Sequence, residues 1–308
     1  MVLKKHISTD DALYVENFAG RAPDSLLDYV QELSKSNSLR FDAASINHLT
    51  ASLSKRWGDF FSSASYYSSL LNSGFDAVQV KNFLPITLPK VVCQAMFLAF
   101  VSRMGRLSPH GAAKDSLIWT MKPQSEKSGN RFRTFSEHSA AAPLHTDSQY
   151  RPKPENFLAF YVYRQARCGG GQTTILNGRK LLNSVVASAW GRSVVKTLSL
   201  AKIPFLIPPI FITDPRKTFV RAPIFGKNPL LRYRSDTLQT ELIKAPPLQK
   251  QGIIESLEFL REAIDSSVHT CEFLLSDGDL LLINNYTNLH GRRAFADQNR
   301  CLFRIRFD

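Results

Sequence analysis

The chain has 308 residues, of which 44% are hydrophobic, and a formal net charge of +13. Its 15 Gly and 16 Pro are ordinary numbers, so the composition indicates a folded globular protein and argues against disorder. The four cysteines lie far apart without a CxxC pair, which argues against a disulfide framework or a zinc knuckle. Residues 1–11 hold no apolar core of signal-peptide length, and no apolar run reaches transmembrane length. We therefore expect a cytoplasmic protein that does not associate with membranes.

The excess of basic residues predicts attraction to anionic partners. Because Lys and Arg are scattered and no zinc-finger or RNP-like motif accompanies them, the pattern disfavours nucleic acid, although the net charge alone would permit it. A solvated basic surface is the simpler interpretation. One local cluster suits a carboxylate, sulfonate or phosphate group, because guanidinium binds these anions in a bidentate way. This cluster consists of Arg292, Arg293, Arg300, Arg304 and Arg306.

The predicted elements begin with helices up to about residue 74, followed by a strand over residues 74–83 whose side chains alternate in period two. An apolar helix, buried on most of its surface, is expected over residues 88–104. Strand-like runs then dominate. They cover residues 117–121, 157–163 and 172–176, and later 271–275, 280–284 and 300–307.

Residues 180–270 interrupt the strands with a proline-rich stretch, a predicted strand around residues 230–234 and a predicted helix over residues 250–266. We interpret this segment as an insertion or lid that helps to set specificity. No internal repeat or linker divides the chain, so we expect one domain over residues 1–308. Its parts would be a helical N-terminal elaboration (1–74), a core (75–179 and 271–308) and the insertion (180–270).

The last predicted strand carries Arg300, Leu302, Arg304 and Arg306 on one face and apolar side chains on the other. In a sheet with one side against a core, the charged face would ordinarily be the solvated one. Here a possible metal site lies nearby in the sequence, so we expect Arg300 or Arg304 to point into the interior instead.

His145 and Asp147 are two residues apart, so on a strand both side chains would point the same way and could bind one ion. His290, distant in sequence, would complete the set. Two imidazoles and one carboxylate leave three positions of an octahedron open, which is the arrangement of non-heme Fe(II) oxygenases. The alternative is that these histidines are ordinary core or surface residues that bind no metal. The apolar, turn-rich approach at residues 140–144 and the β-rich context favour the metal.

Four ordered motifs resemble the TauD/TfdA group of Fe(II)- and 2-oxoglutarate-dependent dioxygenases, in particular its clavaminate-synthase-like members. Residues 143–147 are similar to the group's His-Thr-Asp/Glu motif, and residues 170–173 to its Gly-Gly-x-Thr motif. Residues 288–292 resemble the distal-histidine segment, and residues 300–304 its paired arginines. The resemblance covers roughly residues 70–308. It implies a mainly β fold with flanking helices, a double-stranded β-helix or cupin-like jelly roll.

The resemblance also implies roles for individual residues. His145, Asp147 and His290 would hold Fe(II). Thr173 and Arg300 would bind the distal carboxylate of 2-oxoglutarate, and Arg304 would lie near the substrate or the other carboxylate of the cosubstrate. Gln172 departs from the usual Asp, and nine residues separate His290 from Arg300, slightly fewer than is common. Whether Arg300 or Arg304 is the main 2-oxoglutarate anchor is therefore open.

The implied activity is oxidation by O2 with release of succinate and CO2, most commonly hydroxylation. Desaturation, epoxidation or cyclisation would use the same ligands, whereas the carboxylate of Asp147 argues against a halogenase. The basic strand and the resemblance together favour a small polar, anionic or zwitterionic substrate derived from an amino acid. Two other functions are open, a nucleic-acid- or nucleotide-modifying oxygenase and a jelly-roll binding protein without catalysis. Candidate substrate-pocket residues besides Arg304 are Tyr150, Gln149, Arg232 and Ser139.

Overall fold

The computed structural model describes residues 13–18, 22–36, 38–110, 116–124 and 134–308. The expectation about the signal-peptide region, residues 1–11, lies outside these. The described strands form a seven-stranded sheet, a four-stranded sheet and a two-stranded sheet. All their pairings are antiparallel except that of β1 with β2.

In spatial order the seven-stranded sheet contains β1 (Leu13–Asn17), β2 (Ala77–Lys81), β11 (Leu280–Asn284), β6 (Phe157–Arg164), β13 (Cys301–Phe307) and β3 (Leu107–Ser108), with β4 (Trp119–Met121) also paired to β13. The four-stranded sheet contains β10 (Thr270–Phe273), β7 (Thr173–Asn177), β12 (Asn288–Arg292) and β5 (Ala142–His145). The small sheet pairs β8 (Ile203–Leu206) with β9 (Phe219–Ala222).

The two larger sheets share an apolar core, which confirms the predicted jelly-roll core. Leu158 and Phe160 of β6 and Leu281 of β11 pack in one cluster with Ile175 of β7, from the other sheet. The alternate residues of β6 belong to a different core on the outer side of the sheet. Because β6 is buried on both faces, its sequence is a nearly continuous apolar run instead of an alternating one.

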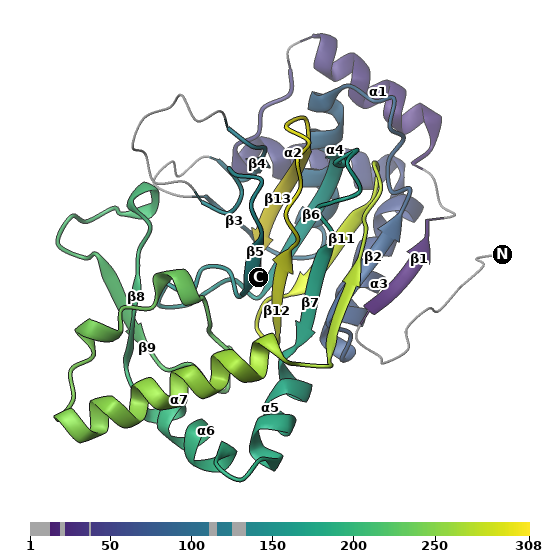
Figure 1. Ribbon diagram of the computed structural model, residues 1–308. Helices are drawn as coiled ribbons and strands as arrows, with labels where there is room; N and C mark the ends of the chain where they lie inside the picture. The colour runs from purple at the N-terminus through teal and green to yellow at the C-terminus, as the bar shows by residue number, and fades with distance from the viewer. Residues whose placement is uncertain (1–12, 19–21, 37, 111–115, 125–133) are drawn as a thin grey trace.

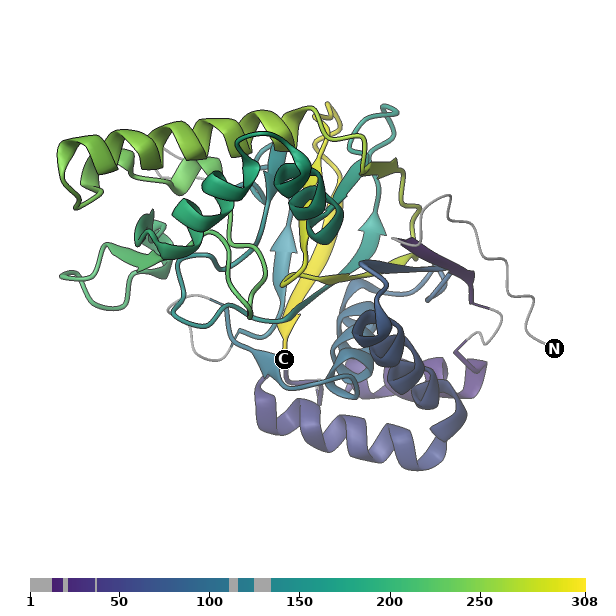
Figure 2. The same ribbon diagram turned by 90° about the horizontal axis from the view of Figure 1, so that it is seen from below.

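Four helices cover the outer face of the seven-stranded sheet (Figure 1), and Figure 2 shows them on the opposite side of the strands from the helices of the insertion. Their apolar faces pack with the alternate residues of β6 and β13 in the largest buried cluster. Asp42 caps the second of them by accepting a hydrogen bond from the Ser45 N–H at 2.9 Å. The four helices are α1 (Asp24–Lys35), α2 (Ala43–Arg56), α3 (Gly58–Ser73) and α4 (Lys90–Ser102).

The segment between β7 and β10, which we interpret from the sequence as an insertion, has an apolar cluster of its own that also includes Leu176 of β7 and Leu289 of β12. Through these two residues the insertion packs on the four-stranded sheet. Its elements besides β8 and β9 are α5 (Gly178–Ala187), α6 (Gly191–Leu200), α7 (Pro247–Asp265) and the short 3-10 helices η1 (Pro209–Phe211), η2 (Ser235–Thr237) and η3 (Thr240–Leu242).

Two expectations about local structure are wrong. The N-terminal region is not wholly helical, because β1 pairs in parallel with β2 at the edge of the large sheet. Residues 230–234 do not form a strand, because Leu231 makes only an isolated bridge to Phe225 and the following backbone is irregular.

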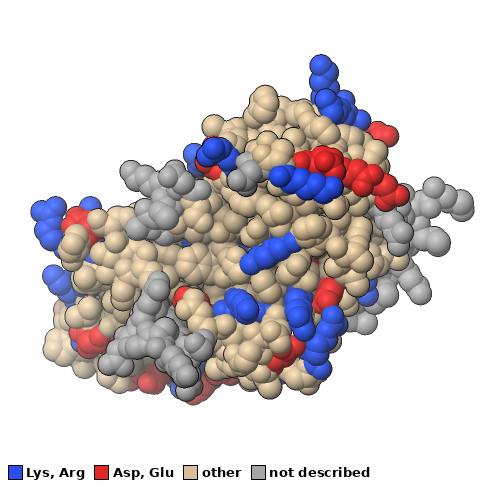
Figure 3. Space-filling view, turned by 90° about the horizontal axis from the view of Figure 1, so that it is seen from above, with Lys and Arg blue, Asp and Glu red and all other residues tan. Residues whose placement is uncertain are grey.

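The surface agrees with a scattered positive charge. In the face drawn in Figure 3, Lys and Arg side chains lie in separate small groups, several of them beside Asp or Glu. Among the described helices, none is both long enough and apolar enough to cross a bilayer.

Candidate metal centre

The pairing of β5 with β12 brings two histidines together. His145, the last residue of β5, is directly opposite His290 of β12, and the ring centroids lie 4.4 Å apart. Asp147 lies close by, so that one possible ligand atom from each of the three residues lies within 4.8 Å of the other two. All three side chains are buried. The three predicted ligand residues therefore meet at one point.

Asp147 reaches this point by a different local structure from the one expected. It does not continue the strand, because β5 ends at His145 and Asp147 begins a turn. The turn is held from two sides. The Thr146 N–H donates to the carbonyl of Tyr233 at 2.7 Å, and the Asp147 N–H donates to Asn285 Oδ1 at 2.8 Å. The period-two argument selected the right residue, although the turn and its partners orient the carboxylate.

The hydrogen bonding of His145 prepares its ring for a metal. Its Nδ1 lies 2.8 Å from the carbonyl oxygen of Pro143. A carbonyl can only accept, so the ring is oriented with Nδ1–H toward Pro143 and with Nε2 toward Asp147, where it can face a metal. Burial and the neighbouring His145 hold the pKa of His290 well below its usual range, so the His290 ring is neutral. Neutral imidazoles are the form that binds divalent metals.

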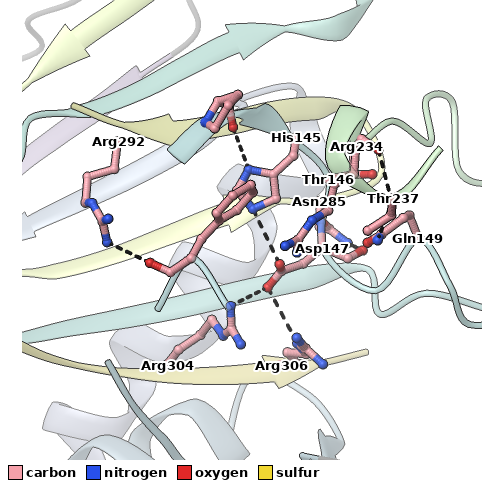
Figure 4. Close-up of polar contacts among 12 residues, drawn as sticks. His145, Thr146, Asp147, Gln149, Arg234, Thr237, Asn285, Arg292, Arg304 and Arg306 are labelled. Carbon is pink, nitrogen blue, oxygen red and sulfur yellow. Dashed lines mark hydrogen bonds and ion pairs between the residues drawn. The ribbon is translucent and has the colours of Figure 1, made fainter. Parts of the chain in front are cut away.

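Asp147 is ionised despite its burial. Burial alone would raise its pKa, but the charges of Arg304 and Arg306 outweigh this effect and hold the pKa well below its usual range. Arg304 Nη1 lies 2.8 Å and Arg306 Nε 3.5 Å from Asp147 Oδ2, as Figure 4 shows. Asp147 Oδ1 lies on the side of His145, 3.7 Å from its Nε2. Two imidazoles and a carboxylate fit a divalent metal of the first transition series.

A pocket of about 540 Å³, part of it open to solvent, adjoins this cluster. The predicted cosubstrate residues Thr173, Arg300 and Arg304 all line it, together with His145 and His290. The expectation that Arg300 or Arg304 points into the interior is therefore confirmed for both. Most of the remaining wall is apolar, with side chains including Phe160, Leu275, Leu281, Ile283 and Leu302.

Arg300 has a guanidinium that suits an anion in this pocket. The residue is 3% exposed, its Nε donates to Gln165 Oε1 at 3.1 Å, and the guanidinium lies 4.9 Å from the centre of the Phe295 ring. Burial and the neighbouring Arg292 lower the pKa of Arg300 to about 9, which leaves it charged at neutral pH. These contacts involve no carboxylate, so an incoming anion can pair with it.

Two predicted substrate residues lie in the turn that follows Asp147. Gln149 is fully buried; its Nε2 donates to Thr237 Oγ1 at 3.0 Å, whereas its Oε1 has no hydrogen-bond partner in the described part of the chain. The Tyr150 hydroxyl accepts a hydrogen bond from Arg306 Nη1 at 3.4 Å, and its ring stacks on Phe211 at 5.2 Å. Both residues are therefore near Asp147, and Gln149 keeps a free acceptor.

The other two predicted substrate residues, like Gln149 and Tyr150, do not line the pocket. Arg232 donates from Nη1 to the carbonyls of Gln149 (2.8 Å) and Arg151 (2.7 Å) and from Nη2 to that of Pro152 (3.2 Å). Its guanidinium is thus used to fix the turn after Asp147. Ser139 accepts a backbone hydrogen bond from Phe295 at 3.0 Å, and its side chain is half-buried away from the pocket.

The arginine cluster near the C-terminus is not one anion site. Arg293 is exposed and pairs with Glu272 at 2.7 Å. Arg292 lines the pocket, but its guanidinium donates to three backbone carbonyls, those of Phe135, His138 and Ala140. It therefore anchors the segment that covers the pocket. This role could not be predicted, because contacts with backbone carbonyls leave no pattern in the sequence.

Residues 79–306 match the family described as "Taurine catabolism dioxygenase TauD, TfdA family". No curated relative matches the chain by sequence. Among solved structures, an asparagine oxygenase in complex with Fe(II), 2S,3S-3-hydroxyasparagine and succinate is similar, with a TM-score of 0.69 and 18% identity over 93% of this chain and 92% of that one. The non-heme iron oxygenase OrfP with Fe, succinate and (3S)-hydroxy-L-Arg has a TM-score of 0.69 and 13% identity, covering 96% of this chain and 94% of that one. OrfP with Fe and alpha-ketoglutaric acid has a TM-score of 0.67 and 14% identity, covering 96% and 93%.

Proposed function

The chain belongs to the TauD/TfdA family and is a non-heme Fe(II)- and 2-oxoglutarate-dependent dioxygenase, and from this premise we propose that it hydroxylates a small polar or anionic metabolite derived from an amino acid. His145, Asp147 and His290 would hold the iron, which together with O2 and 2-oxoglutarate supplies the oxidation and leaves succinate and CO2. One observation carries this assignment: the three buried ligand groups meet beside a pocket that arginine side chains line in part.

Within this proposal Arg300 and Thr173 bind the distal carboxylate of 2-oxoglutarate. The apolar wall formed by side chains such as Leu281 and Leu302 suits the two methylenes between its carboxylates. Arg304 already pairs with Asp147, whereas the described contacts of Arg300 include no carboxylate. This difference favours Arg300 as the main anchor and leaves Arg304 for the substrate.

A polar, anionic or zwitterionic substrate is supported by the groups on the side of Arg304. Arg304 Nε and Gln149 Oε1 are buried and have no hydrogen-bond partner among the described residues. Buried polar groups normally have partners, so a ligand that supplies them is expected. The hydroxylated amino acids bound in the similar oxygenases agree with this class.

Nucleic acid is a weaker candidate. Gripping a phosphate backbone requires a stripe or patch of Lys and Arg. The basic groups on the face in Figure 3 are separate and partly neutralised by neighbouring acids. A steep loss of activity with added salt would be the evidence in its favour.

An anaerobic titration with Fe(II) and 2-oxoglutarate tests the site directly. The wild-type protein should develop the weak visible charge-transfer band of the chelate, and His290→Ala should lose it. His269→Ala is the matched control. His269 is partly exposed, lies within hydrogen-bond distance of Ser184 and does not belong to the proposed ligand set. A band that persists in His290→Ala would overturn the ligand assignment.

The substrate class is tested separately by screening. Amino acids and their carboxylated derivatives should raise succinate release above the basal rate, with incorporation of one oxygen atom into the product, which mass spectrometry detects. If neutral, uncharged small molecules stimulate the reaction and amino acids do not, the proposed substrate class is wrong, although the iron site stands.

A further inference from the structure

We propose that Arg306 is a positioning residue: together with Arg304 it holds one oxygen of Asp147, Oδ2, so that only Oδ1 is presented to the metal. The inference rests on the ligand set proposed above. It assigns a function to a buried arginine that does not line the pocket.

The strand delivers both guanidiniums to the same carboxylate. β13 lies between β6 and the short strands β3 and β4, with Arg306 opposite Leu158 and Ser108. Arg304 and Arg306 are two residues apart and therefore project from the same face. Pairing on both sides fixes the backbone of β13, so the positions of the two side chains are set by the sheet and not by a loop.

The two oxygens of Asp147 have different surroundings. Arg304 Nη1 lies 2.8 Å and Arg306 Nε 3.5 Å from Oδ2, while Oδ1 lies 3.7 Å from His145 Nε2. Both cations thus contact the same oxygen, and the other oxygen lies on the side of His145 (Figure 4). A carboxylate held in this way binds a metal through one oxygen and leaves three coordination positions open, whereas a bidentate carboxylate would leave only two.

Arg306 is less able than Arg304 to leave Asp147. It is 2% exposed, its Nη1 donates to the Tyr150 hydroxyl at 3.4 Å, and its guanidinium lies 5.7 Å from the centre of the Phe211 ring. Arg304, in contrast, lines the pocket and can turn to an incoming anion. When Arg304 binds substrate, Arg306 is the cation that still holds Asp147.

The test compares Arg306→Met with Arg306→Lys by anaerobic Fe(II) titration, absorption of the 2-oxoglutarate chelate and thermal unfolding of the metal-free protein. Removing an outer partner of a metal ligand weakens metal affinity about 10- to 100-fold. We expect a weakening of this size in Arg306→Met with a shifted chelate absorption. Arg306→Lys should recover part of the affinity, because it keeps a charge near Oδ2.

Arg293→Met is the control, because it also removes an arginine paired with a carboxylate, but Arg293 is exposed and its partner is Glu272. It should leave the Fe(II) dissociation constant and the chelate absorption unchanged. The inference is overturned if Arg306→Met binds Fe(II) as tightly as wild type with an unchanged absorption, or if Arg293→Met weakens Fe(II) binding as much as Arg306→Met does.

The same titrations separate this inference from the proposed ligand set. If His290→Ala loses iron and Arg306→Met does not weaken it, the ligand set stands and the role of Arg306 falls. If His290→Ala keeps iron with wild-type affinity, the ligand set falls and the inference falls with it.

Discussion

The buried arginines around the site differ in what balances their charge. Arg304 and Arg306 share the carboxylate of Asp147, and Arg292 donates to three carbonyl oxygens. Arg300 has a neutral amide oxygen and an aromatic ring beside it. A buried charge is costly without a partner of opposite sign. An anionic cosubstrate therefore gains most binding free energy when its carboxylate pairs with Arg300.

Replacing Arg300 should therefore act mainly on 2-oxoglutarate. We expect Arg300→Ala to raise the apparent dissociation constant for 2-oxoglutarate at least about 10-fold, since a charged hydrogen bond contributes roughly 1.5 to 3 kcal/mol. Fe(II) affinity without the cosubstrate should stay the same. Isothermal titration with each ligand measures both. An unchanged 2-oxoglutarate affinity would transfer the anchoring role to Arg304.

At the residue level, chemistry decided what could be predicted. Only a few side chains bind iron, so the sequence indicates His145, Asp147 and His290 as candidate ligands, and the structure brings them together. The partners of these ligands were not identifiable. The contact of Asp147 with Arg306 depends on a turn after β5, and an alternating strand pattern cannot indicate such a turn.

At the element level, Asp76 adds hydrogen bonds between the two sheets to the apolar core that they share. Asp76 immediately precedes β2, in the seven-stranded sheet, and accepts a hydrogen bond from Nδ2 of Asn177 at the end of β7, in the four-stranded sheet. The Asp76 backbone carbonyl accepts another from Asn288 Nδ2, in β12, at 3.1 Å. Asn177 also caps α5 by accepting from the Lys180 N–H at 2.8 Å. Asp76 therefore links the elements that carry the site.

Burial raises the pKa of Asp76 from 3.8 to about 6. The folded protein holds this proton more tightly than the unfolded chain does, so this group's contribution to stability falls as the pH rises from about 4 to 6. The loss amounts to roughly 3 kcal/mol by linkage. Asp76→Asn keeps an oxygen that can accept from Asn177 and cannot ionise. Urea unfolding should show the variant gaining stability relative to wild type as the pH rises through this window; a difference independent of pH would contradict the argument.

The elements themselves were predictable where burial left a strong pattern. The apolar run that forms β6 and the helical spacing that forms α7 were both identified from the sequence. β1 was missed because five residues beside three helices carry little signal of their own and are held by pairing with β2. The predicted strand at residues 230–234 was wrong because this segment is fixed by side-chain contacts, such as those of Arg232 with three carbonyls.

At the scale of the whole molecule, the insertion and the jelly-roll core meet at the metal-ligand turn. The Tyr233 N–H donates to Thr146 Oγ1 at 3.1 Å, the Thr146 N–H donates back to the Tyr233 carbonyl at 2.7 Å, and Gln149 donates to Thr237 at 3.0 Å. The sequence indicated an insertion by its position between strands. It could not indicate that the insertion holds the residues on either side of Asp147, because these hydrogen bonds join segments about 90 residues apart.

This coupling predicts that ligand binding stabilises the insertion as well as the site. A metal bound by Asp147 fixes the turn, and the turn is hydrogen-bonded to residues 233–237. At a ligand concentration about 100 times the dissociation constant, the free energy of opening any segment that must release the ligand rises by about 2.7 kcal/mol. Anaerobic hydrogen exchange with Fe(II) and 2-oxoglutarate should therefore slow amides in residues 145–150 and 231–237 together. Amides of α1, which packs on the opposite side of the seven-stranded sheet, serve as the internal control. Slowing confined to residues 145–150, with 231–237 unchanged, would show that the insertion opens independently of the metal site and does not act as its lid.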